Sequence, residues 1–322
     1  MAEDYTYIVA WLRSLEARLP DRAWFEHFAR TPAEGLLGAL REYYPAFETT
    51  GSIAEFERAL EAEKAAILDN ITALLRDDRP KLFLRAGYDF ANVVVAWTAG
   101  RLQRRPTLVP FGLVSPDDIE RAVAGTSRGV LPEHLETLVE TLERTEAETK
   151  SLAACDYAGE SAAWRFLFGV APGDEARAYL RRKIDLGNVK TFIRLKRSGL
   201  RTESIETVWM EGGEIEPAAL RSHLRGTVED FFTYLSMSPY GGLLGRGLGP
   251  ETALWMVDPI LKRQLMEMLG PSRYRSFDFS PVLYHLELRE RGAEMVRAVI
   301  VGKLNELPEE MMLERVEALL PS

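Results

Sequence analysis

The chain has 322 residues, of which 46% are hydrophobic, and it carries a formal net charge of −9. This hydrophobic content supports a buried core, and the negative charge argues against nucleic acid as the main partner, because cations dominate phosphate binding. One cysteine, Cys155, excludes an intrachain disulfide and a zinc site built from cysteines.

The N-terminal segment is acidic from the start and lacks the basic and apolar regions of a signal peptide. The longest apolar runs, such as residues 93–97, fall far short of the ~20 residues that a membrane span requires. We therefore expect a cytoplasmic chain that is held at a membrane only through another protein.

Helical patterns dominate in chain order. Residues 52–75 begin with Ser52 and Glu55 at capping-box spacing and continue with apolar residues at three- and four-residue steps. Ser115 is the expected N-cap of the next helix, with Pro116 in its first position. Residues 132–154 and 281–304 are long and amphipathic. Strand-like alternation is nearly absent, so the sequence predicts an all-α fold.

Three segments resemble one another: YDFANVVVAWTAGRL, IDLGNVKTFIRLKRSGL and RERGAEMVRAVIVGKLNEL. Asp89 and Asn92 in the first correspond to Asp185 and Asn188 in the second, and Met295 takes the Asn position in the third. Downstream of the first two segments, residues 111–119 and 212–220 share the pattern Gly-x-Val/Ile-x-Pro-x-x-Ile/Leu. We interpret the chain as three repeats, approximately 1–115, 116–220 and 221–322.

The repeated Asp and Asn residues allow two interpretations. An inward-pointing Asn must have its amide satisfied, and Asp89, Asn92, Asp185 and Asn188 recur in one arrangement. We favour structural pins between helices over ligand-binding residues.

Four cations lie within a narrow stripe of the helix expected at residues 179–200, opposite its apolar face: Lys183, Lys190, Arg194 and Arg197. The stripe is either a solvated face or a docking surface for an acidic partner. We call it the basic ridge and predict the docking role.

Residues for catalysis or metal binding are not grouped. The four histidines are scattered, and the sequence has no Walker A loop, no Gly-x-Ser-x-Gly elbow and no His-Glu-x-x-His motif. In the Gly-rich run of residues 241–255 only Arg246 is suited to pairing a phosphate, and no strand precedes it. We interpret this run as a flexible surface loop, and we expect no cofactor.

Residues 156–168, 176–200, 211–215 and 279–310 resemble the C subunit of V-type and A-type rotary ATPases, which is named d in the vacuolar enzyme. The resemblance extends over essentially the whole chain and departs from the family pattern at Met295, where an Asn is common. It implies a funnel or collar of three helical units related by a pseudo-threefold axis.

The resemblance also implies a non-catalytic function. Such a subunit seats the central shaft in its socket and rests on the membrane proteolipid ring, so that the rotor turns as one body. It acts as a monomer within the complex, on the cytoplasmic face of the membrane. The residues alone leave two alternatives: a solenoid-like helical scaffold that binds partner helices or peptides, and a helical enzyme with an unrecognised site.

Overall fold

The computed structural model describes all residues except 1–4, 42, 45–52, 127–128, 199–208 and 321–322. The described part is helical and contains no strand, which confirms the predicted all-α class. Its α-helices are α1 (Thr6–Glu16), α2 (Arg22–Arg30), α3 (Leu36–Arg41), α4 (Ile53–Leu74), α5 (Asp78–Arg101), α6 (Pro116–Val123), α7 (Glu133–Thr149), α8 (Leu152–Val170), α9 (Asp174–Ser198), α10 (Pro217–Leu224), α11 (Val228–Ser236), α12 (Gly242–Gly245), α13 (Leu254–Leu269), α14 (Ser280–Leu304) and α15 (Glu309–Leu319).

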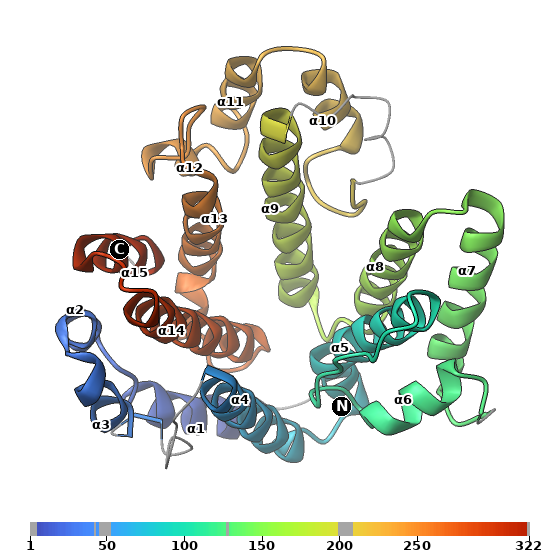
Figure 1. The fold of residues 1–322 in the computed structure, drawn as a ribbon, viewed down its shortest axis with the longest axis horizontal. Coiled ribbons are helices and arrows are strands. Elements are labelled where there is room, and N and C mark those ends of the chain that lie inside the picture. Colours follow the sequence, from blue (N-terminus) through green and yellow to red (C-terminus); the bar gives the residue numbers. More distant parts are fainter. Residues whose placement is uncertain (1–4, 42, 45–52, 127–128, 199–208, 321–322) are drawn as a thin grey trace. The chain divides into compact units, whose positions relative to one another are not determined.

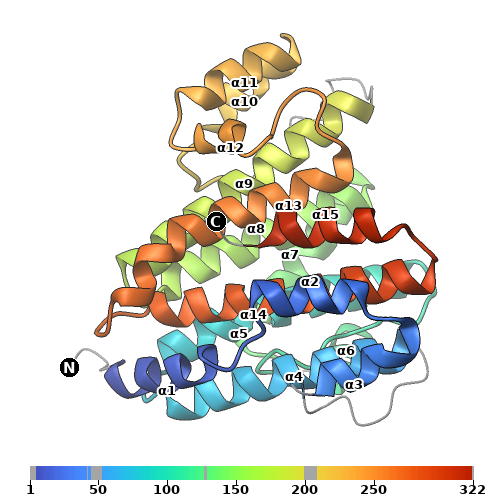
Figure 2. The same ribbon diagram turned by 90° about the vertical axis from the view of Figure 1, so that its left-hand side faces the viewer.

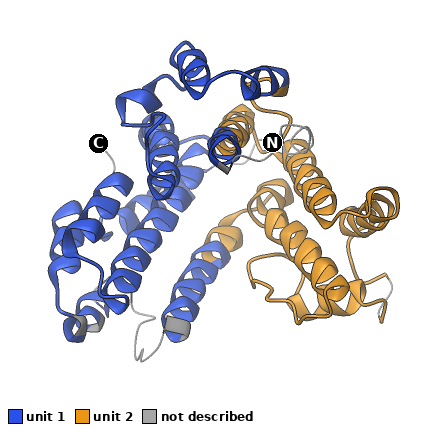
Figure 3. Cartoon of the chain, turned by 45° about the horizontal axis from the view of Figure 1, so that its top comes forward, with its two compact units in different colours: residues 1–69, 189–199, 218–322 blue, residues 70–188, 200–217 orange. Residues whose placement is uncertain are grey.

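The chain divides into two compact units, coloured in Figure 3. Unit 1 comprises residues 1–69, 189–199 and 218–322, and unit 2 comprises residues 70–188 and 200–217. Helices α4 and α9 contribute residues to both units. The division into three repeats along the sequence stays a prediction.

Unit 2 is built on helices α5, α7 and α8, which pack against one another (Figure 1). The core contains buried side chains from all three helices and from α6, among them Trp97, Ile119, Leu138 and Cys155. The single thiol is therefore enclosed by apolar neighbours, and burial raises the pKa of Cys155.

Unit 1 is organised around α14, which packs against α1, α2, α13 and α15; Figure 2 shows α2, α14 and α15 side by side. Phe28 and Leu40 of the N-terminal helices meet Val296 and Val299 of α14 and Val316 of α15 in one apolar cluster. Segments from the two ends of the sequence thus share one core.

Charged side chains also join α4 to α14 within unit 1. Arg297 makes two hydrogen bonds of 2.8 Å to Glu57. Lys64 pairs with Glu290 at 2.7 Å, and Arg289 pairs with Glu63. These residues belong to helix faces that the sequence presents as solvated, but here the charges lie between packed helices. Water reaches all of these ion pairs and screens their charges, so each pair contributes modestly to stability.

The structure tests two local expectations, and a third falls outside the described residues. Ser115 caps α6 as predicted, accepting from the Asp118 N–H at 3.1 Å, with Pro116 in the first turn. The expected cap Ser52 lies outside the described residues. The predicted continuous helix over 132–154 is wrong: α7 ends at Thr149, the C-cap Lys150 has a left-handed φ of 54°, and Ser151 caps α8.

The Gly-rich run is more ordered than the surface loop that we expect from its composition. It includes the short helix α12, and its side chains Leu243 and Leu248 are buried with the preceding Tyr240. Apolar residues between the glycines therefore attach this segment to unit 1.

Candidate functional site

The two repeated Asp residues hold the same kind of turn. Each carboxylate, one on α5 and one on α9, accepts two consecutive backbone N–H groups from the bent segment that precedes the next helix. Asp89 accepts from Leu113 at 2.9 Å and Val114 at 3.0 Å. Asp185, fully buried, accepts from Glu214 at 2.8 Å and Ile215 at 3.0 Å. Bonds to a charged acceptor are roughly twice as strong as neutral ones.

The two Asn residues bind one backbone residue each at two points. Asn92 donates to the carbonyl of Val109 at 2.8 Å and accepts from its N–H at 2.9 Å. Asn188 donates to the carbonyl of Met210 at 2.8 Å and accepts from its N–H at 3.0 Å. An amide offers a donor and an acceptor side by side, whereas an ionised carboxylate offers acceptors alone, so the position favours Asn over Asp.

We call Asp89 with Asn92 the first clamp, and Asp185 with Asn188 the second clamp. On this geometry we propose that both are structural pins. Each clamp holds the backbone of the bent segment before the next helix, whereas we expected pins between two helices.

A glycine is required where each segment meets its carboxylate. A Cβ atom on Gly112 would lie 1.9 Å from Oδ1 of Asp89, and one on Gly213 would lie 2.0 Å from Oδ1 of Asp185. No side chain fits at these distances. The downstream pattern found in the sequence thus coincides with the segments that the clamps hold.

The third segment has no clamp, because Gly292 and Met295 occupy the positions of Asp and Asn. Met295 is buried in the apolar core of unit 1, and Gly292 lies where a Cβ would be 3.2 Å from the hydroxyl of Tyr44. Its helix therefore packs by apolar contact where the other two use polar bonds.

The basic ridge is partly used inside the chain. Lys190 forms an ion pair with Asp258 of α13, and Arg197 donates to the carbonyls of Pro250 and Thr252. Lys183 lies 5.2 Å from the ring centroid of Tyr179. Arg194 is the exposed member, with no hydrogen bond or ion pair to another described residue. Docking by the ridge stays a prediction, and Arg194 is the residue best placed for it.

Asp258 is part of a charge network that the sequence analysis missed. It also pairs with Lys262 at 2.9 Å, and Lys262 bonds Glu294 of α14, so that α9, α13 and α14 are connected. Burial opposes the charge on Asp258, but hydrogen bonds from Lys190 and Lys262 outweigh it and lower its pKa. No sequence spacing relates these residues, because the helices meet only in the fold.

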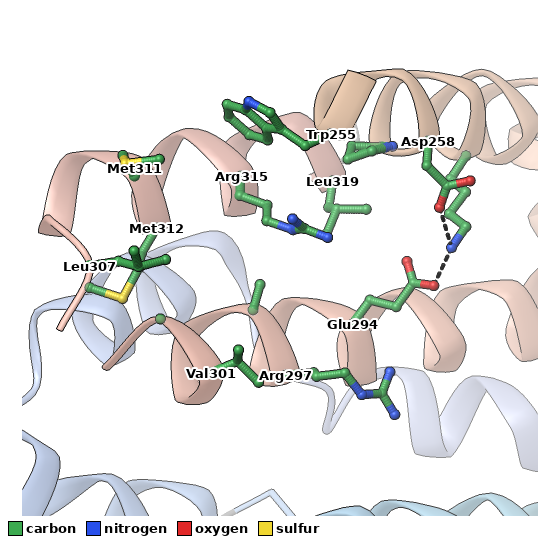
Figure 4. A pocket seen from close by; sticks show the side chains of 14 residues that line it. Trp255, Asp258, Glu294, Arg297, Val301, Leu307, Met311, Met312, Arg315 and Leu319 are labelled. Atoms are coloured by element: carbon green, nitrogen blue, oxygen red, sulfur yellow. Dashed lines mark hydrogen bonds and ion pairs between the residues drawn. The ribbon is translucent and has the colours of Figure 1, made fainter. Parts of the chain in front are cut away.

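This network borders a pocket of roughly 390 Å³ among α13, α14 and α15 (Figure 4). Trp255, Met311 and Leu307 form its apolar part, while the side chain of Arg315 extends into it. The lining combines apolar area with charged side chains, among them Arg297 and Arg315.

Metal-binding clusters of three or more His, Cys, Asp or Glu side chains are absent from the described part of the chain. His285 is buried with Nδ1 3.2 Å from Oε1 of Glu16, and His134 stacks on Phe166. Across the same residues, no helix combines the length and hydropathy needed to cross a bilayer.

Comparison with known proteins gives one result. A search of curated proteins finds no match. A family model described as ATP synthase (C/AC39) subunit matches residues 8–315, nearly the whole chain. The protein therefore belongs to the ATP synthase (C/AC39) subunit family, whose members are components of V-type and A-type rotary ATPases.

Proposed function

We propose that this chain is the non-catalytic rotor subunit that couples the central shaft of a V/A-type ATPase to the membrane proteolipid ring. The observation that carries the proposal is the family match over residues 8–315. In this proposal the subunit is a monomer within the complex and sits peripherally on the cytoplasmic face of the membrane. It transmits torque and performs no chemistry.

The clamps supply a physical reason why such a chain can transmit force. A coupling element must not yield between its two contacts, and each clamp fixes the segment before the next helix to the middle of a long helix by four hydrogen bonds. Buried, charge-assisted bonds resist local opening better than apolar contacts alone. We further propose that the three repeats close around an axis as a collar, and that Arg194 contacts an acidic partner.

Reconstitution tests the coupling function. Complexes assembled in vesicles with and without this chain are compared for ATP hydrolysis and for ATP-driven ion uptake. We expect hydrolysis without ion uptake when the chain is missing, and restored uptake when it is added back. Equal uptake in both preparations would refute coupling.

A second measurement separates the proposal from an enzymatic function. The isolated chain should neither bind nor hydrolyse ATP, which equilibrium binding with a labelled nucleotide checks. Micromolar affinity would contradict the non-catalytic assignment. The collar is tested by an experimental structure of the complex: the helices that hold Asn92, Asn188 and Met295 should be related by successive rotations near ~120°, the value for threefold closure.

A further inference from the structure

One cation in unit 1 is enclosed without a counter-charge bonded to it. Arg291 of α14 is only 2% exposed, and none of its guanidinium nitrogens has a hydrogen-bond partner among the described residues. Buried polar groups are almost always bonded, and an unpaired buried charge is strongly destabilising. An orphaned guanidinium therefore points to a partner that binds there.

The surroundings of Arg291 increase the free-energy cost of its unpaired charge. Burial, with a further contribution from the nearby Arg263, lowers the pKa of Arg291 to about 10. The group still carries its proton at neutral pH. Arg263 lies also near Arg246, whose pKa is lowered by burial and by Arg263. Arg263 of α13 thus lies near both Arg246, at the end of α12, and Arg291 of α14.

The carboxylates nearby are already used by other cations. Glu267 pairs with Arg246 and lies 3.4 Å from Nε of Arg263. Glu294 attracts Arg291 but bonds Lys262. Neither carboxylate makes a hydrogen bond to Arg291.

Beside the group formed by Arg246, Glu267 and Arg263, two further polar atoms lack hydrogen-bond partners. Nε of Arg246 and Oε1 of Gln264 are buried and unbonded. Both side chains border Gly242, where a Cβ would lie 2.6 Å from Nη1 of Arg246 and 3.3 Å from Oε1 of Gln264. A rotation of the Gln264 amide would turn its NH₂ group to the place that the carbonyl oxygen now occupies, which adds a neutral donor.

We propose that Arg291 and Arg263, bordered by Arg246 and Gln264, form a binding site for a small tetrahedral oxyanion of the phosphate class. The guanidinium fork matches the oxygen spacing of such an anion and binds it through two parallel bonds. Arg291 is enclosed, while the side chains of Arg246 and Arg263 are 24% and 29% exposed and form the solvent side. An enclosed site of this kind admits an ion and excludes a nucleotide.

The proposal is independent of the coupling function and is tested on the isolated full chain. Thermal unfolding is followed in sodium phosphate, sodium sulfate and sodium chloride at matched ionic strength, and phosphate binding is measured by calorimetry. A ligand at one hundred times its Kd shifts the folding equilibrium toward the native state about a hundredfold. We expect a rise in Tm with phosphate and sulfate that chloride does not give.

Variants assign the effect to the site. Arg291→Met should abolish the phosphate-specific rise, and Arg291→Lys, which keeps the charge but loses the fork, should reduce it. Arg221→Met removes an exposed arginine of α10 in the same unit and should leave the rise intact. Without phosphate, Arg291→Met should unfold at a higher temperature than wild type, because an apolar side chain replaces an unpaired charge.

Three results would overturn the proposal. One is the absence of any phosphate-specific rise or calorimetric binding in the wild-type chain, which needs no variant to fold. Another is an equal rise in wild type and Arg291→Met. The third is a rise with ATP as large as with phosphate and lost in Arg291→Lys, because the site would then admit a nucleotide.

Discussion

Replacing Gly213 by Ala tests the second clamp most directly. The new Cβ would lie 2.0 Å from Oδ1 and 2.8 Å from Cγ of the buried Asp185, so either the carboxylate or the segment that contains Gly213 must move. Movement breaks the bonds from Glu214 and Ile215. Each hydrogen bond to a charged group contributes about 1.5–3 kcal/mol.

The expected loss is the difference between two effects. Two such bonds sum to at least about 3 kcal/mol, and replacing Gly by Ala returns about 0.4–1 kcal/mol by restricting the unfolded chain. We therefore expect Gly213→Ala to destabilise the protein by at least about 2 kcal/mol. Urea denaturation followed by helical circular dichroism measures the change as a lower midpoint.

The chain offers a matched control on the same helix. A Cβ on Gly187 of α9 meets no atom within 4 Å, so Gly187→Ala should stabilise α9 by about 0.5–1 kcal/mol. The first clamp offers the same pair: Gly112→Ala should destabilise, whereas Gly100→Ala, also without a neighbour, should not. A midpoint for Gly213→Ala equal to or above that of Gly187→Ala would refute the clamp as a determinant of stability.

The remaining predictions concern the charges and the clamp amide. Asp258→Asn should destabilise the chain at neutral pH, because a carboxyl group whose pKa is lowered by folding stabilises the fold at pH values above its ordinary pKa of 3.8. This contribution is lost as the pH falls through the lowered pKa of Asp258. The denaturation midpoints of the variant and the wild type should therefore become equal in acid. Lys190→Glu should lower the denaturation midpoint, because it places a carboxylate against Asp258. Arg194→Glu should leave the midpoint unchanged but weaken binding to purified shaft and ring up to about fivefold at low salt, as one exposed ion pair contributes ~0–1 kcal/mol; equal binding of mutant and wild type at low salt refutes the docking role. Asn188→Leu should cost about 2–6 kcal/mol, since it leaves a buried N–H and a carbonyl unbonded at about 1–3 kcal/mol each. A smaller loss of stability in urea denaturation would mean that water replaces the amide.

The sequence was most informative where local chemistry determines structure. The cap at Ser115 and the helical class depend on short-range patterns, and both are observed. The repeat also located the Asp and Asn residues, because one hydrogen-bonding geometry built twice leaves the same residue types at the same spacing. Helix continuity across Lys150 was predicted wrongly, since the apolar period continues through a residue that adopts a left-handed conformation.

Contacts between helices that are distant in the sequence could not be predicted from the sequence. In the sequence, Lys190 belongs to a stripe that is either solvated or a docking surface. Its partner Asp258 lies 68 residues further along the chain and reaches it only in the folded structure. Arg291 stands in the charged run Arg289-Glu290-Arg291, which is typical of an exposed face, yet it is buried. Burial of a charge depends on which helix packs over it, and the hydrophobic periodicity of a helix does not identify the helix that packs against it.

The clamps also make the position of the next helix independent of the length of the connection that leads to it. Asn92 binds a residue 17 positions downstream, whereas Asn188 binds one 22 positions downstream. From the clamped residue onward the two copies agree: Gly112 and Gly213 come three positions later, and Pro116 and Pro217 begin α6 and α10. The second copy thus has five more residues ahead of the anchor than the first. Insertions or tags placed between the helix end and Val109 or Met210 should leave the next helix in register, which makes these connections natural attachment points.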